Sequence, residues 1–508
     1  MKYRSTIKIF QMKIKTISFN ILSATALLLI LSGCNKLLDK QPVTQIVTPT
    51  NSTTVSATDA ENSISGLYRF LKSDGVEFNI FDRLTNGDVV SDNAYAGGDN
   101  SNNITEDLFT FNSLNENINR DWRGFYAFIA RANITIDQVQ KCVDPALTAA
   151  RRNEILGEAR FMRAFGYFEL VKMFGKVPIM LTPPLTTNAE DLLKSVLVAQ
   201  ASTDSVYDVI LKDLWTSKGV VREIGASTSR YFVSKGAVNA MLAKVYATKP
   251  TPNWDSVKYY CNLVIPNYTL VPNFTYLWDN AHDNNSEAIW VVNYDGWNAG
   301  DQMGNWAPSI FVGGNIGNYE GGGWKKFTTP SNDLVNAYTA EGDNIRLNAT
   351  ITFLDITGQW TDPYWGTAHY PFVTKFNDPS SGTNDFYMIR LADILLLKAE
   401  ALVELNDIPG AMDLVKQVRA RVNLGPKTAA DAAAARLVIA NERRLELAFE
   451  GHRWYDLLRT GKAIEVMNAQ KNGQGVNLNY NVQPYRLLFP IPQVQIDLNP
   501  LLKQNPNY

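Results

Sequence analysis

The sequence predicts a mainly α-helical protein in which helix pairs form a scaffold for one irregular, loop-rich region. Over most of the chain, apolar residues recur at spacings of three and four, as they do on one face of an α-helix. Residues 270–385 differ, because they are rich in Gly, Asn, Asp and Trp and contain only brief strand-like runs such as EAIWVVNY. We therefore expect loops and short strands set on a helical frame.

The chain begins like that of an exported protein. Its first residues are basic, and an apolar segment over residues 21–31 ends in Leu-Ser-Gly-Cys. This order predicts a signal peptide over residues 1–33, too short to span a bilayer as a helix. Met12 opens a signal of its own, so translation could begin there. The LSGC run resembles the lipobox of bacterial lipoproteins, so we expect Cys34 to carry lipid and anchor the protein to a membrane. An ordinary signal peptide with a chance cysteine is the alternative.

The charge balance of the chain argues against one class of binding partner. The chain has 48 Lys and Arg against 50 Asp and Glu, and removal of residues 1–33 leaves 43 basic against 50 acidic residues. This balance argues against nucleic acid as a partner, because phosphate contacts need a clustered positive surface.

Apart from Cys34, the cysteines of the chain are Cys142 and Cys261. A disulfide between them stays open, but two small buried apolar side chains are the simpler interpretation.

The elements follow in order along the chain. Residues 34–56 are rich in Thr, Ser and Pro without a helical period, and we expect a tether there. Residues 57–269 are expected to form an N-terminal helical region and residues 270–508 a C-terminal region, both within one compact unit. The helices of the first region are expected over residues 57–71, 115–141, 148–174, 203–216, 231–247 and 254–265.

The last third of the chain predicts further helices. Residues 385–405 and 408–422 form a pair with a short connection and alanines at the contact, and one long helix is expected over residues 429–460. Short connections and small contact residues are typical of tetratricopeptide-type pairs, although the sequence does not follow that repeat strictly.

Three glutamates form a stripe of like charge on the long helix. Glu442, Glu446 and Glu450 are four residues apart, and like charges at this spacing repel unless cations lie nearby. One interpretation makes two of them the acid/base pair of a glycoside hydrolase. The interpretation that we favour is a network of ion pairs that holds the helix against its neighbours. The pairs expected within the helix are Arg443–Glu446, Glu450–Arg453 and Asp456–Arg459.

Four stretches together resemble one known family. NERRLELAFEGHRWYDLLRTGK is similar to the C-terminal signature of the SusD/RagB family of outer-membrane nutrient-binding lipoproteins of Bacteroidetes. The stretches GEARFMRAFGYFELVKMFGKVPIM, DFYMIRLADILLLKAEALVE and LLFPIPQVQIDLNPLLKQNPNY resemble the family's long N-terminal helix, the helix that opens its C-terminal region and its closing segment.

The resemblance implies both a fold and an activity. The fold would be mostly helical, with four tetratricopeptide-like helix pairs packed against an irregular region that holds the ligand site. The activity would be binding without catalysis or cofactor, at the cell outer membrane and facing the exterior. The ligand would be a glycan, or in some members a peptide, captured for a SusC-like TonB-dependent barrel.

Aromatic residues in the loop-rich region are the first candidates for ligand contacts. A sugar ring offers an apolar face and a rim of hydroxyls, so its site needs flat aromatic rings with polar groups around them. Seven of the eleven tryptophans lie within residues 278–365. We expect Tyr294, Trp297 and Trp306 to contact ligand, with packing onto the helices as the alternative for each ring. Trp290 alternates with apolar neighbours and is expected in the core.

The polar loop after the first helix is the second candidate. Tyr95 supplies a ring, and Asp92, Asn93 and Asn100 supply hydrogen-bonding groups. The resemblance assigns this loop to the glycan site, where a Trp is common in starch binders, so the lone Tyr95 argues against starch. Arg83, just before the loop, could reach sugar hydroxyls or pair with a neighbouring aspartate.

Motifs of other functional classes are absent from the sequence. It contains no phosphate-binding, dinucleotide-binding, serine-hydrolase or zinc-protease motif. Its three histidines are dispersed, so neither a metal site nor a histidine base is indicated. We therefore expect a glycan-binding protein. A peptide-binding member of the same family is one alternative, and a surface glycoside hydrolase with two facing carboxylates is another.

Overall fold

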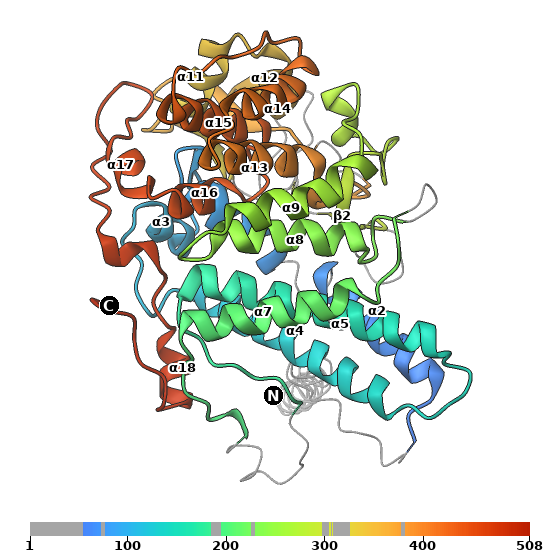
Figure 1. Cartoon of the computed structure of the whole chain (residues 1–508). Helices are drawn as coiled ribbons and strands as arrows, with labels where there is room; N and C mark the ends of the chain where they lie inside the picture. The colour runs from blue at the N-terminus through green and yellow to red at the C-terminus, as the bar shows by residue number, and fades with distance from the viewer. Residues whose placement is uncertain are drawn as a thin grey trace, which may run out of the picture. The chain divides into compact units, whose positions relative to one another are not determined.

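A continuous row of helices forms the frame of the protein (Figure 1). In this computed structural model, each helix of the row packs against the next. The row consists of α4 (Glu116–Lys141), α5 (Ala149–Phe174), α7 (Thr203–Lys218), α8 (Lys235–Thr248), α9 (Trp254–Val264), α13 (Leu391–Glu404) and α14 (Ile408–Ala420). At one end α2 (Ala57–Lys72) packs on α4 and α5, and at the other α15 (Ala432–Glu446) packs on α13 and α14. The mainly α-helical fold expected from the sequence is confirmed.

The structure describes residues 54–72, 77–183, 195–224, 229–296, 304–305, 307, 326–376 and 381–508. Residues 54–508 form one compact unit. The expected signal peptide and Cys34 therefore lie outside the described residues. Within the part that is described, no helix has the length and apolar character needed to cross a bilayer.

Side-chain caps explain where the long helices of the frame begin and end. Helix α4 begins after Asn115, whose side chain accepts hydrogen bonds from two backbone amides of the first turn. Helix α5 begins after Thr148, which caps it in the same way, and it ends at Gly175 with a φ of +71°. These ends agree with the expected bounds to within a residue.

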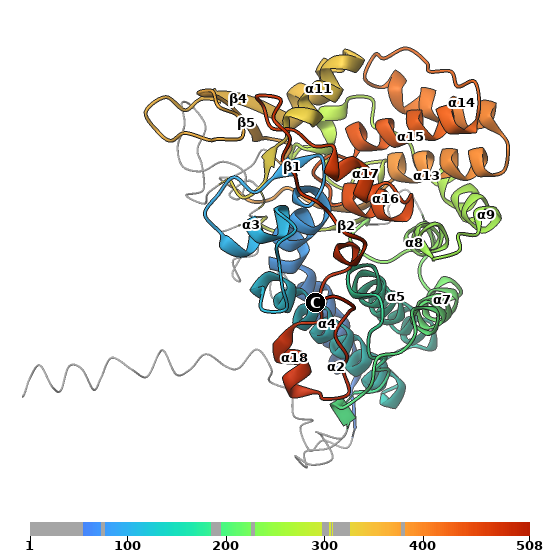
Figure 2. The same cartoon turned by 90° about the vertical axis from the view of Figure 1, so that its left-hand side faces the viewer.

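The strands form three antiparallel pairs. Strand β2 (Ala288–Val292) pairs with β6 (Phe386–Arg390) inside the core, and Trp290 is fully buried there as expected. Strand β1 (Ala94–Tyr95) pairs with β3 (Thr329–Pro330), and β4 (Ile351–Asp355) pairs with β5 (His369–Val373). Figure 2 shows β1, β4 and β5 on the side of the molecule away from α7, α8 and α9.

Two expected helices are corrected by the structure. The helix expected over residues 385–405 begins as strand β6, because an apolar run buried on both faces has no period that separates strand from helix. The helix expected over residues 429–460 is interrupted after α15, and α16 (Arg453–Arg459) begins only after a turn. In that turn Phe449 and Gly451 have φ values of +61° and +77°, which an α-helix does not allow.

The loop-rich region also contains two helices among its described residues, α11 (Asn332–Glu341) and α12 (Asn344–Thr350). Further short α-helices of the described residues are α3 (Ser101–Asp107), α17 (Ala463–Asn468) and α18 (Gln493–Leu498). Cys142 and Cys261 are both buried and free, so they are apolar packing residues and not a disulfide.

Candidate functional site

Strand β1 places the polar loop of the N-terminal region against the β4–β5 hairpin. Tyr95 on β1 stacks on Tyr364 from the hairpin loop, with ring centroids 3.9 Å apart. Its hydroxyl lies 2.8 Å from that of Tyr370, which in turn donates to Asp362 at 2.8 Å. Burial raises the pKa of the Tyr95 hydroxyl, so it stays protonated. Only 5% of Tyr95 is exposed, and its ring thus joins two segments without offering a free face.

The hairpin loop itself presents half-buried aromatic rings. Trp360 packs edge-to-face on Tyr370 and Phe372, with centroids 5.9 and 6.2 Å away. Trp365 packs against Phe353 of strand β4, with ring centroids 5.9 Å apart, and its indole donates to the Pro330 carbonyl at 3.1 Å. Aromatic rings therefore reach the surface around this hairpin.

A lysine adds a charge to these rings. The ammonium of Lys326 lies 4.6 Å from the centre of the Trp360 ring and 4.0 Å from a carboxylate oxygen of Asp362. Burial lowers the pKa of Lys326, while Asp362 and Asp99 oppose this shift. On the opposite face of the hairpin, His369 is exposed and stacks on Phe353, with ring centroids 4.9 Å apart. Lys326 and Trp360 lie on one face of the hairpin, and Phe353 and His369 lie on the other. We call these four residues and Trp365 the hairpin aromatic surface.

Backbone packing next to this surface restricts the neighbouring loop. A Cβ atom on Gly97 would lie 2.4 Å from the Thr329 hydroxyl and 3.0 Å from that of Tyr370. Only glycine allows the loop after β1 to approach the hairpin this closely. The loop after β1 is therefore packed tightly against the hairpin at this point.

Sequence reasoning did not single out Trp360, Trp365 or Lys326. The available signal was the run QWTDPYWGTAHY, in which four aromatic residues fall between two strand-like segments. A cluster of this kind in a loop is typical of a surface that binds flat apolar faces.

The structure assigns internal partners to the polar residues predicted from the N-terminal loop. Asp92 is 2% exposed and accepts hydrogen bonds from Arg453 at 2.7 and 2.8 Å. Burial raises the pKa of Asp92, but Arg444 and Arg453 outweigh it and lower this pKa to about 2. Asn93 is fully buried, and its side-chain oxygen accepts from Arg444 at 3.0 Å. These side chains join the loop to α15 and α16. Asn100 caps α3, accepting from the amide of Asn103 at 3.1 Å.

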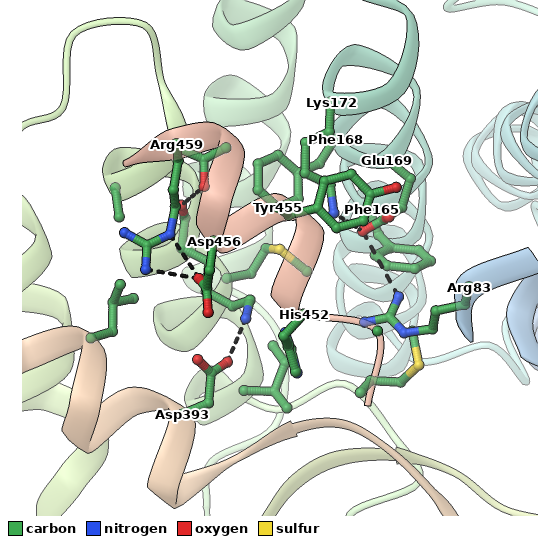
Figure 3. Close-up of a pocket in the computed structure, with 18 of the residues that line it drawn as sticks. Arg83, Phe165, Phe168, Glu169, Lys172, Asp393, His452, Tyr455, Asp456 and Arg459 are labelled. Carbon is green, nitrogen blue, oxygen red and sulfur yellow. Dashed lines mark hydrogen bonds and ion pairs between the residues drawn. The ribbon is translucent and has the colours of Figure 1, made fainter. Parts of the chain in front are cut away.

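Arg83 points into the interior, where Figure 3 shows it beside Glu169, His452 and Tyr455. These residues line a cavity of about 50 Å³, and the Arg83 guanidinium lies 4.0 Å from the Glu169 carboxylate. Lys172 also pairs with Glu169, at 2.9 Å. A cavity of this size holds water and not a sugar ring, since small-molecule pockets measure roughly 300–1,000 Å³.

The aromatic residues predicted from the loop-rich region are separated by the structure. Tyr294 is 1% exposed and belongs to the core, which is the packing alternative stated for it. Trp297 and Trp306 lie outside the described residues. The expected contact of these three rings with ligand therefore stays a prediction only for the two tryptophans.

The glutamate stripe forms the buried ion-pair network that we favoured. Glu446 accepts hydrogen bonds from Arg346 at 2.9 Å and from Arg390 at 2.6 Å. Glu450 pairs with Lys375 and with Arg390, each at 2.7 Å. Glu442 pairs with Arg346 at 2.7 Å and with Arg419 at 2.8 Å.

The cations of this network keep Glu446 and Glu450 ionised. Burial raises the pKa of Glu450, but Arg390 and Lys375 outweigh it and lower this pKa to about 2. Arg421, Arg390 and Arg346 likewise hold the pKa of Glu446 well below its usual range against the effect of burial. A glycosidase acid must be protonated near neutral pH, so Glu446 and Glu450 do not fit that role.

Two of the ion pairs expected within the helix are wrong. Arg443 pairs with Asp393 at 2.8 Å and with Asp456 at 2.9 Å, not with Glu446. Arg453 pairs with Asp92, not with Glu450. The turn after α15 takes Glu450 and Arg453 out of helical spacing. Arg443 and Glu446 both lie within α15, but each is paired with residues outside that helix. The expected pair between Arg459 and Asp456 is present, at 2.8 Å.

Family models match both ends of the chain. A model described as the SusD family matches residues 355–508, and one described as starch-binding and associating with the outer membrane matches residues 37–247. Together they include the polar loop after the first helix, most of the hairpin, and helix α15, which carries Glu442 and Glu446.

Individual proteins are similar over nearly the whole length. One SusD-like protein of Formosa agariphila is 25% identical over 531 residues, covering 93% of this chain and 95% of that protein. A second from the same organism is 27% identical over 471 residues, covering 83% of this chain and 86% of that protein.

Solved structures share the fold. A laminarin-binding SusD-like protein superposes with a TM-score of 0.73 at 26% identity, covering 89% of this chain and all of that one. A SusD superfamily protein of Bacteroides vulgatus has a TM-score of 0.74 at 20% identity, covering 89% of this chain and 99% of that one. With the helical row, the short strand pairs and both family models in agreement, this chain belongs to the SusD/RagB family.

Proposed function

We propose that this protein is a lipid-anchored outer-membrane protein that binds glycan and delivers it to a SusC-like TonB-dependent barrel, without catalysing a reaction. The likeness to the laminarin-binding SusD-like protein carries the proposal, because 26% identity and a TM-score of 0.73 extend over 89% of this chain. The family model described as associating with the outer membrane supports the location.

The hairpin aromatic surface supports glycan as the ligand. Its half-buried rings provide flat apolar faces, and the ammonium of Lys326 and the imidazole of His369 lie beside them. This combination suits a ring that has an apolar face and a hydroxyl rim. Trp297 and Trp306 are proposed to extend the same contacts.

Anchoring and delivery rest on the N-terminal segment. The basic and apolar residues before Leu-Ser-Gly-Cys predict export and lipidation at Cys34. More than one acyl chain would hold the protein on the membrane, because a single chain binds only marginally. A protein held in this way stays close to a barrel in the same membrane and passes ligand to it over a short distance.

Binding is tested by calorimetry of the full chain in detergent against laminarin, starch and a mixture of peptides. We expect heat with a glycan, and Trp360→Ala should weaken binding about tenfold, because one stacked ring contributes about 1–2 kcal/mol. Trp215→Ala is the matched control, since Trp215 is 51% exposed on α7 on the far side of the molecule. Heat with peptides alone would contradict a glycan ligand, and sugar release on incubation would contradict the absence of catalysis.

Anchoring is tested in cells. The wild-type protein should fractionate with the outer membrane and incorporate radiolabelled fatty acid, while Cys34→Ala should do neither. Equal labelling of both proteins would contradict lipidation at Cys34. Delivery requires that the wild-type protein co-purify with a TonB-dependent barrel.

A further inference from the structure

A second cavity, of about 510 Å³, opens at the base of the β4–β5 hairpin. It lies between helix α12, the ends of both strands and the loop that follows a short 3₁₀ turn (Phe274–Leu277). Buried Trp278 and Lys375 line its inner part, and exposed Asn280 and Asn348 line its mouth. This volume falls within the range of small-molecule pockets.

The cavity lies on the same face of the hairpin as Trp360. Side chains alternate along a strand, so Tyr370, Phe372 and Thr374 point to one face, and Trp360 contacts the first two. The hydroxyl of Thr374 lies 3.1 Å from that of Thr352, and both threonines line the cavity. Tyr370 and Thr374 are four positions apart on an extended chain, a distance of about 13 Å.

The charged groups of the cavity already have partners. The ammonium of Lys375 donates to the Glu450 carboxylate and to the Ala448 carbonyl, each at 2.7 Å. The carboxylate of Asp279 accepts from the imidazole of His282 at 2.7 Å. An anionic ligand would therefore meet no free cation among the described lining residues and would face the Asp279 carboxylate.

Two neutral hydrogen-bonding groups of the cavity lining have no partner among the described residues. The Asn348 amide is exposed at the mouth and makes no hydrogen bond to any residue that the structure describes. The indole nitrogen of Trp278, in the buried wall, also lacks a hydrogen-bond partner among these residues. An amide both donates and accepts, which matches a sugar hydroxyl.

We propose that this cavity binds one neutral sugar unit of the same glycan chain whose neighbouring units lie on Trp360 of the hairpin aromatic surface. The inference rests on the proposed glycan-binding function and adds a second point of contact to it. A disaccharide is too short to reach both places, whereas a hexasaccharide extends across the intervening strand. The cavity thereby favours long, uncharged chains.

The test is calorimetry of the full chain in detergent with a neutral β-glucan hexasaccharide. Asn348→Ala removes the free amide and should weaken binding about fivefold, the loss of one hydrogen bond. Asn344→Ala is the matched control, because Asn344 is exposed on the same helix and does not line the cavity. Ala349→Trp fills the cavity and should weaken binding at least about tenfold. Ala340→Trp, on the exposed side of α11, is its control.

The outcomes separate this inference from the function on which it rests. If the wild-type protein binds the hexasaccharide and neither Asn348→Ala nor Ala349→Trp weakens binding, the cavity is no sugar site, while glycan binding stands. If no glycan gives heat, the proposed function fails and this inference fails with it. Equal or tighter binding of an oligouronate of the same length would overturn the preference for a neutral sugar.

Discussion

Glu106 is a carboxylic acid enclosed by the frame, with 0% of its surface exposed. Burial and the nearby Asp82 carboxylate raise the pKa of Glu106 to about 8, while Asn117, Arg120 and Asn115 oppose this shift. The folded protein therefore binds this proton more tightly than the unfolded chain does. The resulting stabilisation is complete below the unfolded pKa of about 4.3 and is lost as the pH rises through about 8.

Glu106→Gln should remove this pH dependence, because an amide stays neutral at every pH. We expect the stability of the wild-type protein, relative to the variant, to fall between about pH 5 and about pH 8. The measurement is the midpoint of urea unfolding at several pH values. A difference that stays constant over this pH range would contradict the raised pKa.

Single side chains of the polar loop mark a limit of sequence reasoning. Asp92 and Asn93 have the composition of ligand-binding loop residues, yet their partners Arg444 and Arg453 lie about 350 positions later in the chain. Local composition carries no signal for a pairing at that distance. The burial of Cys142 and Cys261 was predictable, because their own chemistry favours the core.

At the scale of elements, the polar loop is held by a contact between two glycines. Residues Thr85–Val89 form a π-helical turn, and a Cβ atom on Gly87 would lie 2.3 Å from the Cα atom of Gly451 in the turn between α15 and α16. Because the close atoms are backbone, neither segment can yield by rotating a side chain. The N-terminal loop and the C-terminal helices are therefore joined at this point.

Gly87→Ala should destabilise the protein by about 3 kcal/mol, the upper range for overpacking. The measurement is the free energy of unfolding in urea. Gly66→Ala is the control, since Gly66 lies in α2 with nothing within 4 Å of an added Cβ atom. That substitution should stabilise by about 0.5–1 kcal/mol. If both variants lose equal stability, the close approach does not hold the loop.

Periodicity predicted most elements, and its failures have physical causes. The expected helix over residues 57–71 is α2, because one face of it is apolar at helical spacing. The interruption after α15 depends on the positive φ of Phe449, which a bulky residue rarely adopts and no pattern suggests. The hairpin aromatic surface was missed for a related reason, since register and partner strand decide which loop rings stay exposed.

At the scale of the whole molecule, the C-terminal segment ties the end of the chain to the first half of the frame. The Asn505 amide donates to the carbonyl of Phe174, at the end of α5, at 3.1 Å and to that of Phe489 at 2.7 Å. Tyr508 donates to the carbonyl of Leu488 at 2.6 Å. The bond to Phe174 therefore joins the C-terminal segment to the end of α5.

Asn505→Ala should cost about 1–3 kcal/mol, because two carbonyl groups lose their donor. The thermal unfolding midpoint should fall accordingly, while Lys503→Ala, at an exposed position of the same segment, should leave it unchanged. Early cleavage by protease near residue 490 in the Asn505 variant would support the same role. An unchanged midpoint would show that the hydrogen bonds of Asn505 do not stabilise the fold.

The buried ion-pair network has a consequence for how such a chain changes over generations. Arg346 and Lys375 lie just outside the β4–β5 hairpin, and each is held by buried glutamates of the frame. The intervening residues 351–373 are thus fixed at both ends, while their own aromatic surface takes no part in the network. Changes at its half-buried rings therefore leave both anchors in place. Mutations at these rings can then change which ligand the protein recognises while the fold is kept.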